Sequence, residues 1–182
     1  MSIRIDLSKR HSVVAANAHY YKVPTDVRYI DRTLQYHDLI YMVDGQWSFS
    51  ENDQDYSLSK GDVLLLSAGR HHYTRQPCSA GTQTICIHVT CESGDNKLPQ
   101  NETPSRALCL PTHLHANSSP EIKSYFERIV SSYWQEGEYR QEEMSALLDL
   151  LFVGVFDMGV AGAAIATLVS RVISGVVITY LL

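Results

Sequence analysis

Two adjacent histidines, His71 and His72, are the side chains of this sequence best suited to chemistry. They end the segment GDVLLLSAGRHHY, residues 61–73, in which a turn, an apolar strand and a second turn of small residues precede them. Imidazoles placed after a strand can bind a metal ion, contact a small ligand or fill space in a core. Because successive side chains of a strand point to opposite faces, the two histidines cannot bind one ion together.

Short strands separated by turn residues are predicted on both sides of this segment. Residues 33–43 (TLQYHDLIYMV) are rich in strand formers and end at an Asp-Gly turn. Residues 82–91 (TQTICIHVTC) alternate in polarity, with Ile85, Ile87 and Val89 on one face. Strands of this kind, spaced about 8 to 12 residues apart without a helical period, indicate an antiparallel barrel or sandwich.

The pattern changes after residue 116, where two amphipathic helices are predicted. Ser119 and Pro120 suit the start of a helix, Gly137 suits its end, and a second helix is expected from Tyr139 or Arg140. Apolar side chains recur three and four residues apart along the first helix, at Ile122, Tyr125, Phe126, Ile129 and Tyr133. This stripe can cover the barrel, or it can form a dimer surface with a second chain.

Length and charge narrow the classes of function. A chain of 182 residues, 45% of them hydrophobic, can bury one substantial core. The formal net charge is −5 and the 15 basic residues are scattered, whereas a chain that grips nucleic acid carries a basic patch. The N-terminus lacks the apolar run of a signal peptide, and the four cysteines have no CxxC spacing. We therefore expect a cytoplasmic protein with reduced cysteines.

The segment that ends at the histidines resembles the second conserved motif of cupin barrels. That motif runs Gly, five residues, Pro, any residue, Gly, two residues, His, and its positions fall at Gly61, Ser67, Gly69 and His72, with serine replacing proline. Between residues 10 and 150 the chain is similar to the N-terminal sensor and dimerisation domain of AraC-type transcription regulators. The resemblance implies a mainly β fold: a cupin-like antiparallel β-barrel (a double-stranded β-helix) followed by two helices, forming a homodimer.

A small-molecule effector site in the barrel is the main functional expectation. The residues expected to form it lie on or beside strands that should line the cavity: Tyr36, Asp38, His72 and Tyr73. Arabinose is not the expected effector, because Asp44 stands where the arabinose-binding relative has an arginine, and Thr84 and Cys86 replace a histidine and a tryptophan. A planar donor and a stacking ring that suit a sugar are therefore missing.

A small metal-dependent cupin enzyme is the first alternative. Such enzymes add a motif with His-x-His followed by a glutamate, whereas the matching region here holds only His37 and Asp38. Iron and manganese sites usually need at least two histidines and a carboxylate. The sequence also shows no nucleophile beside a positioned base. We therefore expect no metal site, no cofactor and no catalytic residue.

The end of the chain differs from the rest in composition. Residues 158–182 contain one charged residue, Arg171, and are long enough to span a bilayer. From residue 147 onward the sequence resembles a transmembrane segment of multidrug and toxin extrusion transporters. A membrane-attached fusion fragment is therefore the second alternative, and a soluble helix that packs on the barrel remains a third interpretation of the tail.

These observations divide the chain into three expected parts. Residues 1–116 form an N-terminal arm and the ligand-binding barrel, residues 117–150 a helical dimerisation segment, and residues 151–182 a hydrophobic tail foreign to the sensor fold. Removal of the tail after residue 150 is expected to leave the fold intact. The helix-turn-helix units of AraC-type regulators are not recognisable in the sequence. DNA contact is therefore expected only through a module outside these residues.

Overall fold

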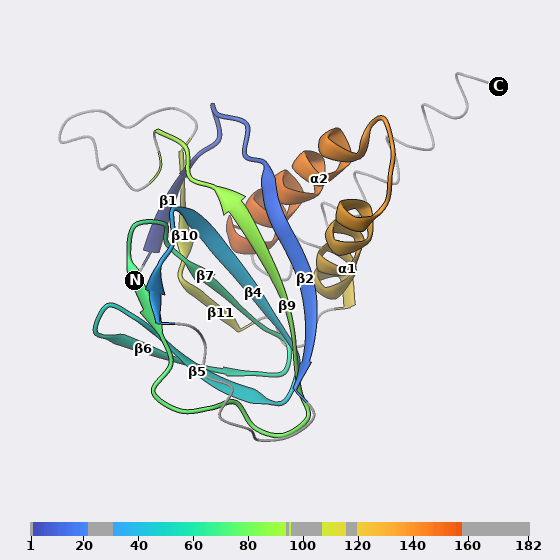
Figure 1. Ribbon diagram of the computed structural model, residues 1–182. Helices are drawn as coiled ribbons and strands as arrows, with labels where there is room; N and C mark the ends of the chain where they lie inside the picture. Colours follow the sequence, from blue (N-terminus) through green and yellow to red (C-terminus); the bar gives the residue numbers. More distant parts are fainter. Residues whose placement is uncertain (1, 22–30, 94, 96–106, 116–119, 158–182) are drawn as a thin grey trace, which may run out of the picture.

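The computed structural model describes residues 2–21, 31–93, 95, 107–115 and 120–157 (Figure 1). In these ranges antiparallel strands form three sheets, and helices follow them. A two-stranded sheet joins β1 (Ser2–Asp6) to β10 (Ala107–Pro111). A five-stranded sheet has the order β11 (His113–His115), β7 (Asp62–Leu66), β4 (Tyr36–Asp44), β9 (Thr82–Thr90), β2 (Val13–Tyr21). A four-stranded sheet has the order β3 (Arg32–Thr33), β8 (His71–Tyr73), β5 (Gln46–Glu51), β6 (Gln54–Ser59).

The central strands of the five-stranded sheet are buried on both faces. In β4, Leu39 and Tyr41 belong to one hydrophobic cluster and Ile40 and Met42 to another, because side chains alternate along a strand. The first cluster includes side chains of the helices. The second includes Trp47 of the four-stranded sheet, so it fills the space between the two larger sheets. We call that space the barrel interior.

One glycine shapes the hairpin between β4 and β5. Gly45 has a φ of +84°, a conformation that residues with a Cβ rarely adopt. A Cβ on Gly45 would also lie 2.5 Å from Oγ1 of Thr82. The carboxylate of Asp44 accepts the N–H of Gly45 at 3.0 Å. Asp44 is therefore a turn residue that stabilises this hairpin.

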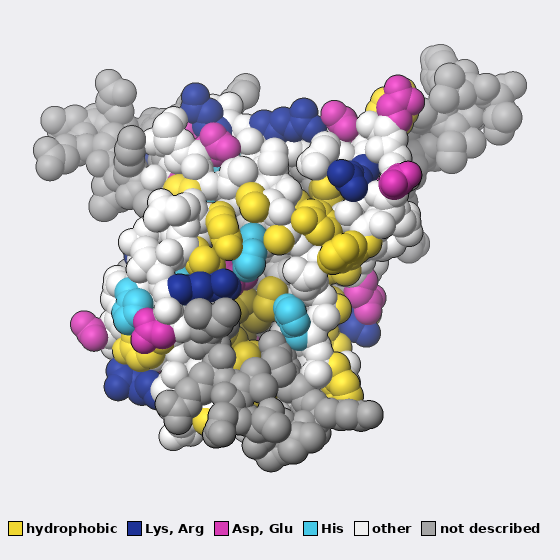
Figure 2. Space-filling view, in the orientation of Figure 1, with side chains coloured by type: hydrophobic (Ala, Val, Ile, Leu, Met, Phe, Trp, Pro, Cys, Tyr) yellow, Lys and Arg dark blue, Asp and Glu magenta, His cyan; other side chains and the backbone are white. Residues whose placement is uncertain are grey.

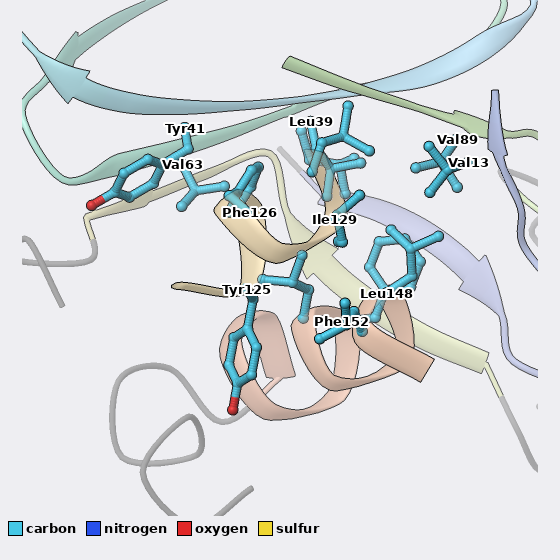
Figure 3. Close-up of a cluster of buried hydrophobic side chains, with 14 of the residues drawn as sticks. Val13, Leu39, Tyr41, Val63, Val89, Tyr125, Phe126, Ile129, Leu148 and Phe152 are labelled. Atoms are coloured by element: carbon cyan, nitrogen blue, oxygen red, sulfur yellow. The ribbon is translucent and has the colours of Figure 1, made fainter. Parts of the chain in front are cut away.

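Two helices, α1 (Pro120–Trp134) and α2 (Arg140–Asp149), pack on the first face of the five-stranded sheet (Figure 1). Figure 3 shows side chains of α1 directed at the sheet, and the rings of Phe126 and Tyr41 lie 5.3 Å apart. The residues expected at a dimer surface lie in this core: Ile122, Tyr125, Phe126 and Ile129 are buried and Tyr133 is partly buried. The stripe therefore covers the barrel of its own chain and is not exposed as a dimer surface, which corrects that expectation. Dimer formation itself stays a prediction.

The end of α1 also protects the free edge of β2, an outer strand of the five-stranded sheet. The hydroxyl of Tyr133 donates to the carbonyl oxygen of Val14 at 3.2 Å. The indole N–H of Trp134 donates to the carbonyl oxygen of Ala16 at 3.0 Å. Such contacts occupy edge carbonyls that could otherwise pair with another strand.

A π-helical segment, η1 (Leu150–Asp157), continues α2 into the core. Leu151 and Phe152 are completely buried, and the ring of Phe152 meets that of His11 edge-on at 5.8 Å. A boundary after residue 150 is therefore wrong, because the core includes the next two side chains. The transporter-like tail expected at 158–182 lies outside the described residues. Among the described residues, no helix has the length and apolar character needed to cross a membrane.

Candidate functional site

The barrel interior combines apolar walls with buried polar side chains. Its hydrophobic members come from both larger sheets: Ile40, Met42, Trp47, Phe49, Tyr56, Leu58, Leu64, Leu66 and Cys78. Figure 2 shows histidine side chains next to hydrophobic ones in the middle of one face of the molecule. The buried polar side chains of this region are candidates for ligand contacts, because small-molecule sites combine apolar walls with a few polar groups.

His72 is the buried polar residue with the least explained environment. It is 0% exposed, and neither of its ring nitrogens has a hydrogen-bond partner. The strand β8 places it opposite Glu51 of β5, with Nε2 of His72 3.5 Å from Oε1 of Glu51. This approach is too long and poorly aligned for a hydrogen bond. A fully buried imidazole without a hydrogen-bond partner is rare, because its desolvation is not fully offset.

Glu51 faces His72 as a fixed anion. Its Oε1 accepts the N–H of Ser67 at 2.6 Å, and its Oε2 accepts Nη1 of Arg70 at 2.7 Å. Burial by itself would raise the pKa of Glu51, but the contacts with His72, Ser67 and Arg70 outweigh it and lower that pKa. The carboxylate therefore stays charged, and it is oriented by the turn that the cupin-like motif encodes.

A second polar group lies on the strands β4 and β9. Nε2 of His88 is 3.5 Å from Oδ2 of Asp38, which is completely buried, and the rings of His88 and Tyr36 lie 4.5 Å apart. Burial raises the pKa of Cys86, the charge of Asp38 raises it further, and the charge of Arg32 lowers it. The thiol therefore stays protonated.

The structure brings three of the four expected site residues to the barrel interior. Tyr36 and Asp38 share the face of β4 that carries Ile40, and His72 points inward from β8. Tyr73 does not join them. It stacks on the exposed ring of His71 at 5.0 Å and accepts a hydrogen bond from Arg75 at 3.1 Å, on the other side of β8.

Tyr73 instead lies near a surface pocket on the outer side of β5 and β6. This pocket has a volume of about 280 Å³, and Ser50, Asp55 and Arg75 line it. Arg75 contacts both Tyr73 and Asp55 in this region. The side chains that line the pocket are mostly exposed, so water screens their charges.

Sequence reasoning missed Glu51 and Arg70. Glu51 begins the polar stretch ENDQD, which has the composition of an ordinary turn, and it meets His72 only through the pairing of β5 with β8. The sequence signal that could have found it is its place at the end of the alternating segment WSFSE. There it shares the inward face with Trp47 and Phe49.

A separate network lies on the opposite side of the five-stranded sheet. The Oδ2 atom of Asp95 lies 2.9 Å from Nε2 of His11 and 3.2 Å from Nε2 of His37. The carboxylate also accepts the N–H groups of Asp6 and Glu92, both at 2.8 Å. Burial opposes the charge of Asp95, but these contacts outweigh it and hold the pKa of Asp95 well below its usual value.

Two groups of side chains in the described ranges could converge on a metal ion. One consists of His37, Cys91 and Asp95, and the other of Asp62, His113 and His115. Neither includes His72, the histidine that matches the cupin-like motif. The described residues thus give no support for a metal centre at the motif histidine.

Comparison with known proteins agrees with this architecture. The family model described as "AraC-like ligand binding domain" matches residues 17–152. A search of curated proteins finds no match. Apo ToxT K231A from Vibrio cholerae is similar in structure, with a TM-score of 0.50, 11% identity, and coverage of 85% of this chain and 59% of that chain.

Two further solved structures are similar over about half of the chain. An RmlC-like cupin from Shewanella frigidimarina has a TM-score of 0.38, 15% identity, and coverage of 50% of this chain and 78% of its own. The conserved SPY1581 protein of unknown function from Streptococcus pyogenes has a TM-score of 0.38, 12% identity, and coverage of 51% and 77%. At such identities a structural likeness concerns the fold alone. The family match spans most of the chain and the strand and helix order agrees with it, so this chain belongs to the family of AraC-like ligand-binding domains.

Proposed function

We propose that this chain is the effector-sensing domain of an AraC-type transcription regulator and that a small molecule binds in the barrel interior. The observation that carries the proposal is His72, completely buried with both ring nitrogens unpaired. Such a group costs about 1 to 3 kcal/mol of desolvation free energy when it has no partner. A ligand that hydrogen-bonds to it would offset this cost.

The surrounding groups indicate the chemistry of the effector. Glu51 and Asp38 are buried acids near the expected site, and Trp47 and Phe49 supply apolar surface. A molecule with an apolar or aromatic body and a hydrogen-bonding group directed at His72 fits both features. The carboxylate of Glu51 is an acceptor that is held in place by hydrogen bonds from Ser67 and Arg70. A ligand group beside it is therefore favoured if it donates a hydrogen bond.

A route from the interior to the helices runs through the five-stranded sheet. The strands β4 and β9 carry polar side chains on the inner face and the residues that contact α1 and α2 on the other. The end of α1 is hydrogen-bonded to the neighbouring strand β2. We propose that an effector regulates transcription by biasing the position of these helices, which act on a DNA-binding module outside the described residues. The coupling free energy equals the difference in the free energy of effector binding between two arrangements of the helices.

The test is a thermal-shift screen of the whole chain against sugars, aromatic acids and amino-acid derivatives. A ligand that binds the folded state raises the melting temperature. For any hit, His72→Ala should weaken affinity at least tenfold, which corresponds to about 1.4 kcal/mol. The matched control is His71→Ala, which removes the exposed neighbour on the opposite face.

Tyr73→Phe separates the barrel interior from the outer pocket. It removes only the hydroxyl that Arg75 contacts, so affinity for an interior ligand should not change. A hit whose affinity falls with Tyr73→Phe but survives His72→Ala would place the ligand outside and refute the proposed site.

A further inference from the structure

A cluster of two histidines and an aspartate lies away from the motif histidine, at an edge of the five-stranded sheet. The outer strand β11 has the sequence His-Leu-His, so the side chains of His113 and His115 share one face. In the pairing of β11 with β7, His115 stands opposite Asp62 and His113 opposite Leu64. Directly opposed residues of antiparallel strands share a face, so the histidines lie on the side of the barrel interior, to which Leu64 belongs.

The nitrogen and oxygen atoms of this cluster converge. Nδ1 of His115 is 3.1 Å from Oδ1 of Asp62, and Nε2 of His113 is 3.3 Å from Oδ2 of the same residue. The three ligand atoms lie within 4.8 Å of one another. Two ligand atoms bound to one tetrahedral ion at about 2.1 Å would be roughly 3.4 Å apart. The side chains therefore need only small shifts to hold one ion.

Two further observations indicate that the side chains are already arranged for a ligand. Nε2 of His113 is a buried atom without a hydrogen-bond partner, although it is close to Asp62, because its N–H direction is not aimed at the oxygen. The carboxylate of Asp62 is held in place by the N–H of Ser59 at 2.9 Å and its hydroxyl at 3.1 Å. Groups that orient a ligand in this way are typical of the outer shell of metal sites.

We propose that Asp62, His113 and His115 bind a divalent transition-metal ion of the zinc class, with water in the remaining coordination position. Two imidazoles and one carboxylate suit Zn²⁺ better than Mg²⁺ or Ca²⁺, which prefer oxygen ligands. The half-exposed position of the cluster gives an ion access, since the side chain of His115 is 71% exposed while that of Asp62 is 5% exposed.

The cluster lies at the edges of the two larger sheets. The strand β11 is an outer strand of the five-stranded sheet, and β6 is an outer strand of the four-stranded sheet. The ring of Tyr56, from β6, meets that of His113 edge-on at 6.3 Å. An ion at the cluster would therefore fasten β11 to the start of β7 where the two sheets face each other. This inference does not depend on an effector in the barrel.

The test is zinc titration of the metal-free whole chain by calorimetry, with the melting temperature as a second measurement. The wild type should bind one ion and melt at a higher temperature with zinc. His115→Ala removes an exposed ligand with little risk to folding, so it should lower zinc affinity at least tenfold and abolish the thermal shift. His71→Ala, another exposed histidine, should leave both measurements unchanged.

Cys91→Ser distinguishes this cluster from the other convergent group, which contains a thiol. Zinc binding should survive Cys91→Ser, and bound Co²⁺ should show tetrahedral visible bands without a thiolate charge-transfer band. The proposal is refuted if the wild type binds no zinc, if His115→Ala keeps full affinity, or if Cys91→Ser abolishes binding. Each result is independent of the effector screen, so the two proposals can fail separately.

Discussion

His37 and His72 are both completely buried, but they lie on opposite sides of the barrel wall and differ in their contacts. On the helix-covered side, Nδ1 of His37 accepts the N–H of Ala68 at 3.2 Å, and Nε2 donates to Asp95 at 3.2 Å. In the barrel interior, neither nitrogen of His72 has a partner. On the helix-covered side both nitrogens of His37 are paired, although Nδ1 of His11 lacks a partner, whereas in the interior both nitrogens of His72 lack one.

This difference separates a structural role from a binding role. A hydrogen-bonded buried network fixes segments that are distant in sequence, and its loss is costly. An unpaired buried group lowers stability, so its presence needs another explanation, such as a missing ligand. Changes on the helix-covered side should therefore affect folding, and changes in the interior should affect binding.

The largest effect is expected from ending the chain after residue 150. This removes Leu151 and Phe152 from the helix-covered core, at about 2 to 5 kcal/mol for each large buried side chain. The total approaches the whole stability of a typical domain, about 5 to 15 kcal/mol. We expect an unfolded or strongly destabilised protein by urea denaturation. A chain that ends after residue 157 retains η1 and is the matched control; equal stability of the two would contradict this account of the core.

Asp95→Ala should cause the next largest loss. It leaves the N–H groups of His37, Asp6 and Glu92 without their acceptor, so the free energy of unfolding should fall by about 3 to 5 kcal/mol.

His72→Leu is the contrasting change in the interior. It removes an unpaired polar group, so stability should stay within about 1 kcal/mol of the wild type or rise. A large loss from His72→Leu would show that His72 has a structural role instead.

A smaller effect is expected in the dependence of stability on pH. Burial would lower the pKa of His11, but Asp95 outweighs it and raises that pKa above 6.5, while the pKa of Asp95 is lowered below 3.8. The contribution of His11 is therefore complete below pH 6.5 and is lost as pH rises through its raised pKa. The contribution of Asp95 is present above pH 3.8 and is lost as pH falls through its lowered pKa.

The difference in stability between wild type and His11→Gln should thus be greatest in mildly acidic solution and decrease above neutral pH. Urea denaturation at several pH values measures it. His71→Ala serves as the control for a histidine outside the network. A difference that grew with rising pH would have the wrong sign and would exclude the ion pair as its cause.

Several local features could be predicted from the sequence. The alternation of residues 82–91 puts Ile85, Ile87 and Val89 on one face, which is the helix-covered core, and the strand rule puts His71 and His72 on opposite faces. The motif resemblance predicted an antiparallel barrel with two following helices, which agrees with the described strands and helices. Each of these inferences uses only residues close together in the chain.

Other features were not predictable, because they depend on contacts between distant segments. Asp95 lies in a stretch with the composition of a simple polar loop, yet it joins the starts of β2 and β4 to β1. The stripe of α1 is suited equally to a barrel and to a second chain, and only the packing of the helix assigns it to the barrel. A hydrophobic pattern specifies that a face is buried but not which surface covers it.

The sequence by itself determined the strands at residues 33–43 and 82–91, the placement of His71 and His72 on opposite faces, and the resemblance that leads to the family. Only the tertiary structure decided that Glu51 faces His72, that Tyr73 points outward, and that Leu151 and Phe152 complete the core. The reason is that local preferences act over a few residues and fix the face of each side chain. Strand pairing and helix packing then determine the partner of each face, and they do so between segments that can be many residues apart.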